Sequence, residues 1–437
     1  MARMVVIADD LTGAADCAAP SAALGCKATV LLYSSGEQGW DASWPDADIL
    51  SIDANTRCLA AEQASESITR LVHLCHSRNA QHPGYVLYKK IDSTLRGNVA
   101  SELAALLHTR RSNNAESANL SMLMAPSLPA QGRTTVGGRL FVHGVPLEKT
   151  DIWQTEACAP PSDISQLLAD ASLSCGLIDM QIVRSGSTAL RQAILQSAKQ
   201  NDVVLCDAET DGDLRAIAEV SVGEPALTAW VGSAGLAAQI SYAIDIVPEP
   251  NRPEIGFASG PTLLVVGSAA SISQHQARLL EAIPEVETFH ATPAALRDSP
   301  AMHTQIFQSL QFRRDVLLML DGGELHSMYE VQFLTQALSD LVSRSAQFLG
   351  GLVATGGETA RAVLDALGIH RLWLLGEVEP GLPFSVADCC SRPLPVITKA
   401  GAFGSPQALI RCRDFLRELE RAPARLHANN PLMDHES

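Results

Sequence analysis

The chain has 437 residues, 46% of them hydrophobic and 5% aromatic, and its 32 basic and 48 acidic residues give a formal charge of −16. This length predicts two or three domains, because a single hydrophobic core rarely grows beyond about 250–300 residues. The acidic balance disfavours general attraction to nucleic acid or acidic membranes, so an anionic ligand would need a local concentration of positive charge.

The first predicted element is a buried strand at 4–8, which leads into the acidic turn Asp9-Asp10 and a helix over 14–24. Thr12 is expected to cap this helix and Gly25 to end it. In an open α/β sheet such a turn lies at the carboxyl end of a strand, where these folds bind ligands. Two adjacent aspartates there suit Mg²⁺ binding or removal of a proton from a hydroxyl. The alternative is a solvated acidic turn at a helix start.

Strands and helices then alternate, which predicts a mainly parallel sheet flanked by helices. A strand at 28–33 would complete a β-α-β unit with the first strand. The other strands of this half are expected at 49–53, 85–90, 120–125, 175–178, 203–207 and 230–235, and its helices at 60–77, 98–107 and 189–199. The segment 126–150 breaks the alternation because it is rich in Pro, Gly, Thr and Arg, and we expect a long functional loop or hairpin there.

Residues 245–261 contain four prolines and little periodicity, which predicts a linker. A second α/β alternation follows, with strands expected at 262–267, 316–320, 350–355, 371–376 and 394–399, and a last helix from Ser405-Pro406 to about 421. The predicted fold class is therefore α/β, with two domains that each hold a mainly parallel sheet flanked by helices. We assign 1–245 to the first domain, 246–261 to the linker, 262–421 to the second domain and 422–437 to a disordered tail.

The cysteines and the hydrophobic runs bear on location. Ten cysteines occur without a CxxC pair, and several lie in apolar segments, which is typical of reduced cysteine in a reducing cytoplasm. No signal-peptide hydrophobic region precedes the first strand, and no apolar run of about 18 residues occurs. We expect a soluble, cytoplasmic protein.

The chain has only six lysines, so the adjacent pair Lys89-Lys90 at a predicted strand end is informative. It opens the segment 89–98, which adds Arg96, two hydroxyl side chains and a helix start. A helix N-terminus with hydroxyls and arginine suits a carboxylate or phosphate, and an ordinary capped helix is the alternative. In the segment 126–150, Gln131 and Arg133 flank a glycine, an arrangement that suits binding of a small polar anion. The alternative is a plain surface loop.

Three glycine-rich turns follow apolar strands of the second half, at 267–271, 355–359 and 399–404. Glycine there lets the backbone approach a ligand and offer N–H groups to phosphate oxygens, and Lys399 adds positive charge. Three such turns at one sheet edge predict a nucleotide site, although none matches the Walker loop or GxGxxG. We interpret 321–324 as a polar turn rather than a metal site, and the twelve histidines lack metal-ligand spacing.

Six motifs, in order along the chain, resemble those of the four-carbon acid sugar kinases. They are Ile7-Ala-Asp-Asp-Leu-Thr-Gly-Ala14, Lys90-Ile-Asp-Ser-Thr-Leu-Arg-Gly-Asn98, Pro129-Ala-Gln-Gly-Arg-Thr134, Gly267-Ser268 with Ser271 and Gln274, Thr355-Gly-Gly-Glu-Thr359, and Lys399-Ala-Gly-Ala-Phe-Gly404. The resemblance implies an N-terminal domain that binds a sugar acid, a C-terminal domain that binds ATP, and an active site in the interdomain cleft. It also implies transfer of the γ-phosphoryl group to a hydroxyl. The second motif is similar to the branch that converts D-threonate to 4-phospho-D-threonate, with D-erythronate and 3-oxo-tetronates as alternative substrates.

The resemblance also implies roles for residues in these motifs. One of Asp9 and Asp10, preferably Asp10, would orient or deprotonate the attacking hydroxyl. The residues expected to bind the acid are Asp10, Arg57, Lys90, Ile91, Asp92, Ser93, Arg96, Gln131 and Arg133. Those expected to bind ATP are Ser268, Ser271, Gly356, Gly357, Glu358, Thr359, Lys399, Gly401 and Gly404. Mg²⁺ would bridge the phosphates, with its protein ligands unassigned.

The expected partners are the sugar acid and ATP, without nucleic acid or membrane, and a homodimer stays open. Two other functions would keep part of the pattern. A hydroxy-acid oxidoreductase would also have two α/β domains, but it should show a Rossmann fingerprint with an acidic residue about 20 positions on, and we find none. A non-catalytic sugar-acid-binding protein would keep the basic segment of the first half and need none of the glycine turns.

Overall fold

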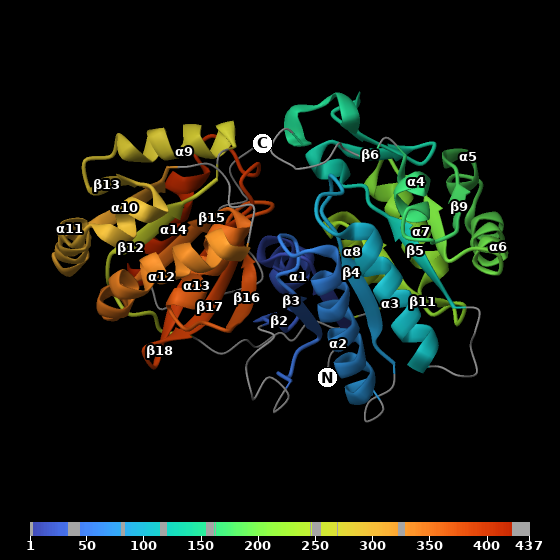
Figure 1. The fold of residues 1–437 in the computed structure, drawn as a ribbon, viewed down its shortest axis with the longest axis horizontal. Helices are drawn as coiled ribbons and strands as arrows, with labels where there is room; N and C mark the ends of the chain where they lie inside the picture. Colours follow the sequence, from blue (N-terminus) through green and yellow to red (C-terminus); the bar gives the residue numbers. More distant parts are fainter. Residues whose placement is uncertain are drawn as a thin grey trace. The chain divides into compact units, whose positions relative to one another are not determined.

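The computed structural model describes residues 3–33, 44–79, 84–113, 120–153, 161, 163–244, 246, 255–268, 270–321 and 328–421. The chain divides into two compact units, Met1–Ala18 with Tyr33–Val247, and Ala19–Leu32 with Pro248–Ser437 (Figure 1). The division falls inside helix α1 (Leu11–Ala23). Half of the predicted linker and all of the predicted tail lie outside the described residues, so these domain boundaries stay a prediction.

The sheet of the first unit is parallel, as the alternation predicted. Its strand order is β3-β1-β4-β11-β5-β10-β9, and β1 is buried at every position. The strands are β1 Met4–Ala8, β3 Ile49–Asp53, β4 Val86–Lys90, β5 Ser121–Ala125, β9 Cys175–Ile178, β10 Val203–Cys206 and β11 Leu227–Gly232. Each neighbouring pair runs parallel. Their carboxyl ends therefore share one edge of the sheet.

Helices flank this sheet, with α2 packed against α3 and α7 against α8 (Figure 1). The helices of this unit after α1 are α2 Ala61–Asn79, α3 Val99–Asn113, α4 Ile164–Ala169, α5 Met180–Val183, α6 Ser187–Ala198, α7 Asp211–Ser221 and α8 Ala234–Ala243. The segment expected as a long loop or hairpin is an antiparallel sheet in the order β6-β7-β8. Its parts are η1 Pro129–Gln131, β6 Arg133–Val136, β7 Arg139–Val142, β8 Val145–Pro146, η2 Leu147–Lys149 and η3 Asp151–Trp153.

The sheet of the second unit combines parallel and antiparallel strands in the order β13-β14-β12-β15-β18-β17-β16-β2. The parallel strands are β12 Thr262–Val266, β13 Val286–Ala291, β14 Asp315–Leu320, β15 Gly351–Thr355 and β18 Arg392–Lys399. The antiparallel strands are β2 Ala28–Leu32, β16 Arg371–Glu377 and β17 Pro383–Cys389. The helices are α9 Ser271–Glu281, α10 Pro293–Asp298, α11 Pro300–Gln311, α12 Met328–Ser345, η4 Ala346–Phe348, α13 Gly357–Ala366 and α14 Ala408–Arg421. Helix α9 packs against α14, and α12 against α13 (Figure 1).

The two strands of the expected β-α-β unit at the start of the chain do not pair directly with each other. Strand β1 pairs with β3 and β4, whereas β2 pairs antiparallel with β16, with Leu31 opposite Arg371. The sequence identified β2 as a strand because four of its five residues are apolar, but a fully buried strand carries no alternation that would identify its neighbour. Helix α14 begins at Ala408 rather than at Ser405-Pro406.

The structure bears on two features considered in the sequence, membrane-spanning helices and cysteines. Among the described residues, we find no helix whose length and hydrophobicity would let it span a membrane. The described cysteines are free thiols, several of them buried. Burial raises the pKa of the Cys17 and Cys75 thiols to about 12, so both are protonated at neutral pH.

Glu377, at the end of β16, should make the stability of the fold depend on pH. Burial raises the pKa of its carboxyl from 4.5 to about 7, and its Oε1 accepts the Gly381 N–H at 3.3 Å. The protonated carboxyl therefore stabilises the fold fully below pH 4.5, and this contribution is lost as the pH rises through 7. Glu377→Gln is expected to exceed the wild type in free energy of unfolding by about 3 kcal/mol near pH 8 and to match it near pH 4.5. Urea unfolding across this range measures the difference, and a difference that does not change with pH contradicts the prediction.

Candidate active site

The first part of the candidate site lies where the neighbouring strands β3, β1 and β4 end. After β3 the chain turns back, because the N–H groups of Thr56 and Arg57 donate to the carbonyl of Asp9 at 3.0 and 3.2 Å. Asn98 Nδ2 then donates to the carbonyl of Thr56 at 2.9 Å. These bonds bring the acidic turn, Arg57 and the segment 90–98 together.

Arg57 joins three carboxylates. Its Nε donates to Asp9 Oδ2 and its Nη1 to Asp10 Oδ2, each at 2.8 Å, and Nη2 lies 3.7 Å from Asp92 Oδ2. Burial opposes the charge of Arg57, but the carboxylates of Asp10, Asp9 and Asp92 raise the pKa of its guanidinium group. Burial would raise the pKa of Asp10, but Arg57 and Lys90 hold it below its ordinary value. Asp10 and Arg57 are therefore both charged at neutral pH.

Asp10 also begins helix α1. Its Oδ1 accepts the Gly13 N–H at 2.9 Å and its Oδ2 accepts the Thr12 hydroxyl at 2.6 Å. Asp10 is thus the cap, and the prediction that Thr12 caps the helix is wrong, because the carboxylate reaches the amide three residues on and the helix starts at Leu11. A Cβ on Gly13 would lie 2.6 Å from both Asp10 Oδ1 and Lys90 Nζ. Glycine at this position therefore lets the lysine approach the aspartate.

The two adjacent aspartates differ in the acceptors they leave for a ligand. Both oxygens of Asp10 accept bonds from the protein. In Asp9, Oδ2 accepts from Arg57, whereas Oδ1 is buried with no hydrogen-bond partner in the described part of the chain. A buried acceptor without a partner is unfavourable, so a ligand hydroxyl or ion is its expected occupant. These contacts favour Asp9 as the proton acceptor, whereas the sequence alone favours Asp10.

Asp92 organises the segment 90–98. Its Oδ1 accepts from the Thr94 amide at 2.9 Å and from the Thr94 hydroxyl, and Arg96 donates to both carboxylate oxygens at 3.2 and 3.0 Å. Burial opposes the charge of Asp92, yet Arg96 and Arg57 hold its pKa well below the ordinary range. Asp92 is therefore a fixed anion that orients two guanidinium groups.

Further contacts shape this segment. Leu95 has a φ of +63°, a left-handed conformation that is uncommon for a branched residue. Trp153 Nε1 donates to the carbonyl of Thr94 at 2.8 Å, and no motif in the sequence points to this tryptophan. Of the remaining predicted acid-binding residues, Ser93 is half-buried, and the Ile91 side chain is buried in the core.

A buried ion pair between Lys89 and Glu102 supports the end of β4. Lys89 Nζ lies 2.8 Å from Glu102 Oε2 and donates to the carbonyl of Lys90 at 2.9 Å, and both charged side chains are essentially inaccessible. Removing one partner of such a pair costs about 3–5 kcal/mol, because the other charge stays buried. Lys89 is thus a support for Lys90 rather than a ligand-binding residue.

The hairpin after β5 brings Arg133 close to the Asp92 segment. Burial lowers the pKa of Arg133, Asp92 raises it, and Arg96 lowers it, so these three charges lie close enough to interact. Gln131 supplies a backbone carbonyl that accepts from Arg133 Nη1, and its side chain is half-buried. The structure therefore groups Arg133 with Arg96 near Asp92.

Asp207, which the sequence analysis did not single out, anchors this hairpin to the end of β10. Its carboxylate accepts the N–H groups of Gly137 and Gly138 at 2.7 and 3.0 Å. Thr135 and Ala208 also exchange two backbone hydrogen bonds, at 2.9 and 3.1 Å. An aspartate directly after an apolar strand is the only sequence signal for this role.

In the second unit, the predicted glycine turns follow β12, β15 and β18, which are neighbouring parallel strands. The turns converge, since a Cβ on Gly267 would lie 2.0 Å from Thr359 Oγ1, and one on Gly401 would lie 2.0 Å from Ser268 Oγ. Gly356 has a φ of +95°, and a Cβ there would lie 3.7 Å from Ser268 N. Side chains at Gly267 and Gly401 would collide with Thr359 and Ser268, so these glycines let the three turns pack closely. Closely packed glycine turns bring backbone N–H groups together in a cradle of the kind that holds phosphate groups.

The other residues predicted to bind nucleotide lie at helix starts or in the 399–404 loop. They are Ser271 at the start of α9, Gly357 and Glu358 in the first turn of α13, and Gly404. Lys399 is placed differently from a phosphate-binding lysine. Its side chain is fully buried, and Nζ donates to Ser273 Oγ at 2.9 Å and to carbonyls of its own loop.

Within the described residues, no cluster of three or more His, Cys, Asp or Glu could hold a metal ion. The turn 321–324 lies mostly outside those residues. Asp9 and Asp10 already lie beside Arg57 and Lys90, which would compete with a cation. These residues fit Mg²⁺ only as an ion carried by phosphate oxygens, with Asp9 Oδ1 as an available carboxylate oxygen.

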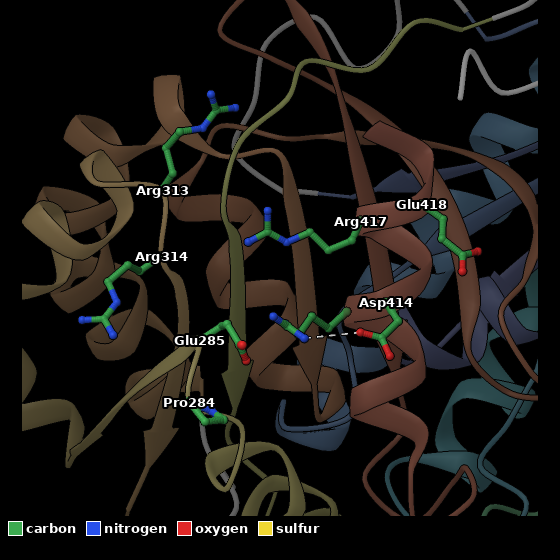
Figure 2. A pocket seen from close by; sticks show the side chains of 8 residues that line it. Pro284, Glu285, Arg313, Arg314, Asp414, Arg417 and Glu418 are labelled. Carbon is green, nitrogen blue, oxygen red and sulfur yellow. Dashed lines mark hydrogen bonds and ion pairs between the residues drawn. The ribbon is translucent and has the colours of Figure 1, made fainter. Parts of the chain in front are cut away.

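A pocket of about 740 Å³ in the second unit is not part of this site (Figure 2). It is lined by Pro284, Glu285, Arg313, Arg314, Arg413, Asp414, Arg417 and Glu418. Arg413 Nε and Arg417 Nη2 donate to the fully buried Asp315, at 2.6 and 2.8 Å. Because Asp315 begins β14, the pocket lies at the amino ends of the strands, whereas the glycine turns lie at their carboxyl ends. Two of its four arginines neutralise the buried carboxylate, and the acidic residues of the lining offset the others, which leaves little net charge for a ligand.

Comparison with known proteins gives consistent matches over both units. A family model for a sugar-binding N-terminal domain matches residues 4–240, and one for a nucleotide-binding C-terminal domain matches 263–409. D-threonate kinase of Cupriavidus necator is 38% identical over 96% of this chain and 99% of its own length, and that of Salmonella typhimurium is 29% identical over 95% and 99%. D-erythronate kinase of Heliobacterium modesticaldum is 28% identical over 95% and 97%. A solved structure from Salmonella typhimurium LT2 has a TM-score of 0.73 at 21% identity, covering 94% of this chain and 99% of that protein, which supports the fold alone.

Proposed function

The chain belongs to the four-carbon acid sugar kinase family, and we propose that it transfers the γ-phosphoryl group of ATP to a hydroxyl of D-threonate, giving 4-phospho-D-threonate. The observation that carries this proposal is the presence of two complementary sites in one chain. One is a cluster of carboxylates, arginines and a lysine at the strand ends of the first unit, and the other is a glycine cradle at the strand ends of the second. D-Threonate is the substrate named for the relative with 38% identity, and D-erythronate and 3-oxo-tetronates are the alternatives.

In this proposal the acid binds at the end of β4. Its carboxylate is received by Arg96 and Arg133, whose charges interact near Asp92. Its hydroxyls bond to Lys90 and Ser93. Burial opposes the charge of Lys90, but neighbouring carboxylates raise its pKa, so the lysine is protonated at neutral pH. An acidic protein can bind an anion here because Lys90 and several arginines are concentrated at one point.

Proton transfer is assigned to the aspartate pair. Phosphoryl transfer depends mainly on positioning and on neutralising charge, and the attacking hydroxyl needs an acceptor for its proton. Of the two aspartates, Asp9 has an oxygen, Oδ1, without a hydrogen-bond partner among the described residues, while Arg57 holds both carboxylates in place. When bound with the nucleotide, Mg²⁺ would neutralise charge on the phosphates.

The nucleotide is assigned to the cradle of the second unit. Backbone N–H groups around Ser268, Gly356 and Gly401 would receive the phosphates, with the first turns of α9 and α13 contributing the favourable end of their dipoles. Thr359 lies against Gly267 and closes one side of the cradle.

The test is an ADP-release assay with D- and L-threonate, D- and L-erythronate and their oxo forms, with the position of the phosphate read by phosphorus NMR. The highest kcat/KM is expected for D-threonate, with phosphate on the hydroxyl at carbon 4. A higher kcat/KM for D-erythronate or an oxo acid would move the chain to another branch of the family. Stabilisation against heat by the acid, without ADP release for any acid, would indicate a non-catalytic sugar-acid-binding protein.

A further inference from the structure

The loop 400–405, which borders the nucleotide cradle, is held from below by buried polar side chains. Lys399 Nζ donates to the carbonyls of Ala400, Gly401 and Phe403 at 3.1, 3.2 and 3.0 Å. Gln276 of α9, 1% exposed, donates through Nε2 to the carbonyls of Phe403, Gly404 and Ser405 at 3.2, 3.3 and 2.8 Å. A lysine and a glutamine thus bind nearly every carbonyl of one short loop.

Two further side chains, Ser273 and Glu379, also hold the loop. Ser273, also on α9, accepts from Lys399 Nζ at 2.9 Å and donates to the carbonyl of Gly401 at 2.6 Å. Glu379, in the turn between β16 and β17, accepts from Ser405 N at 2.7 Å and from Ser405 Oγ at 3.0 Å. The loop is therefore tied to α9 on one side and to the β16–β17 turn on the other.

The direction of the carbonyls decides what the loop presents to a ligand. In a planar trans peptide the C=O and N–H groups point in opposite directions. Because the carbonyls of Gly401 and Phe403 point toward Lys399 and Gln276, the N–H groups of Ala402 and Gly404 point away from them. Gly401 in turn lies against Ser268, at the cradle itself. The buried side chains thus fix the directions of the backbone donors in this loop, and Gly401 places the start of the loop beside Ser268.

We propose that Gln276 and Glu379, together with Lys399, are positioning residues that fix the 400–405 loop for ATP binding, and that none of the three contacts the nucleotide. This inference rests on the proposed function, because it takes the cradle to be the ATP site. It assigns Lys399 a different task from the phosphate contact that its motif suggests. Its ammonium already has four protein acceptors, the Ser273 hydroxyl and three carbonyls of its loop.

The test compares Gln276→Met and Glu379→Ala with the isosteric variant Glu379→Gln. The carboxamide of Glu379→Gln keeps an acceptor for Ser405 N, so this variant should recover most of the affinity that Glu379→Ala loses. Matched controls are Gln308→Met and Glu287→Ala, which make similar chemical changes away from the loop. ATP affinity is measured by titration calorimetry without sugar acid, and KM for ATP, KM for D-threonate and kcat are measured separately.

Gln276→Met and Glu379→Ala are expected to weaken ATP binding by about 10- to 100-fold, since a displaced loop misplaces its donors. KM for D-threonate should stay near the wild-type value, and both controls should bind ATP normally. Unchanged ATP affinity in folded Gln276→Met overturns the inference, and this variant carries the test if Glu379→Ala fails to fold. Equal losses in Glu379→Ala and Glu379→Gln also overturn it. A wild-type chain that binds ATP but phosphorylates no tetronate would refute the proposed function and leave this inference standing.

Discussion

Asp9→Asn is expected to lower kcat by about two to four orders of magnitude, the range that a general base contributes, while KM for ATP stays near the wild-type value. Asp9 Oδ1 is a buried acceptor with no partner in the described part of the chain, so the protein leaves this oxygen to the substrate. A carboxamide has nearly the same shape and can still accept a bond from Arg57 through its oxygen. What it loses is the capacity to take a proton.

Asp10→Asn should act differently, because Asp10 has protein donors on both oxygens. An asparagine caps a helix as well as an aspartate does, so α1 should keep its start. Arg57 and Lys90 lose a counter-charge, and we expect a smaller fall in kcat and a change in KM for the acid. Steady-state kinetics of both variants, with the exposed Asp388→Asn as control, separate the two roles. A larger fall in kcat for Asp10→Asn than for Asp9→Asn would make Asp10 the base, as the sequence alone favours.

The alternation of apolar runs was enough to predict the class of the fold and most strands of both units. The alternation was not enough to predict which strands pair with one another, because a strand that is buried on both faces has no polar side to orient it. Strand β2 is the clearest case, since its pairing with β16 depends on a strand more than 300 residues later in the chain. Strands β13 and β17 were missed. In β13, three half-buried positions and one exposed position interrupt the apolar pattern.

The sequence predicted the site better where a motif concentrates chemistry than where contacts come from elsewhere. The acidic turn and the Lys90 segment follow neighbouring strands of the first unit, and the glycine turns follow neighbouring strands of the second, so the motifs of each unit lie together at its strand ends. The orientation of side chains within these motifs could not be read from residue order. Lys399 looked like a phosphate-binding lysine, yet its ammonium is bonded inside its own loop. The roles of Trp153 and Asp207 could not be predicted, because each side chain bonds to a segment that is distant in sequence.

Gly401→Ala is expected to weaken ATP binding by about 100-fold while leaving D-threonate binding intact. Gly401 is not among the residues with positive φ, so alanine imposes no backbone strain and the variant tests space alone. The new Cβ would lie 2.0 Å from Ser268 Oγ and 2.8 Å from Ser268 Cβ. Rotation of the serine hydroxyl could relieve the first contact but not the second, so the two turns must separate where the phosphates are proposed to lie. Calorimetric titration with ATP and with D-threonate measures both effects.

Gly256→Ala is the matched control, because a Cβ there meets no atom within 4 Å. It makes the same chemical change in the same unit, so it should bind ATP like the wild type. Thermal unfolding of both variants separates a local effect from loss of the fold, since overpacking typically costs about 1–3 kcal/mol. A folded Gly401→Ala protein with wild-type ATP affinity would show that the cradle formed by Gly267, Gly356 and Gly401 does not receive the phosphates. The nucleotide would then have to bind elsewhere, and the assignment of the second unit to ATP would lose its structural basis.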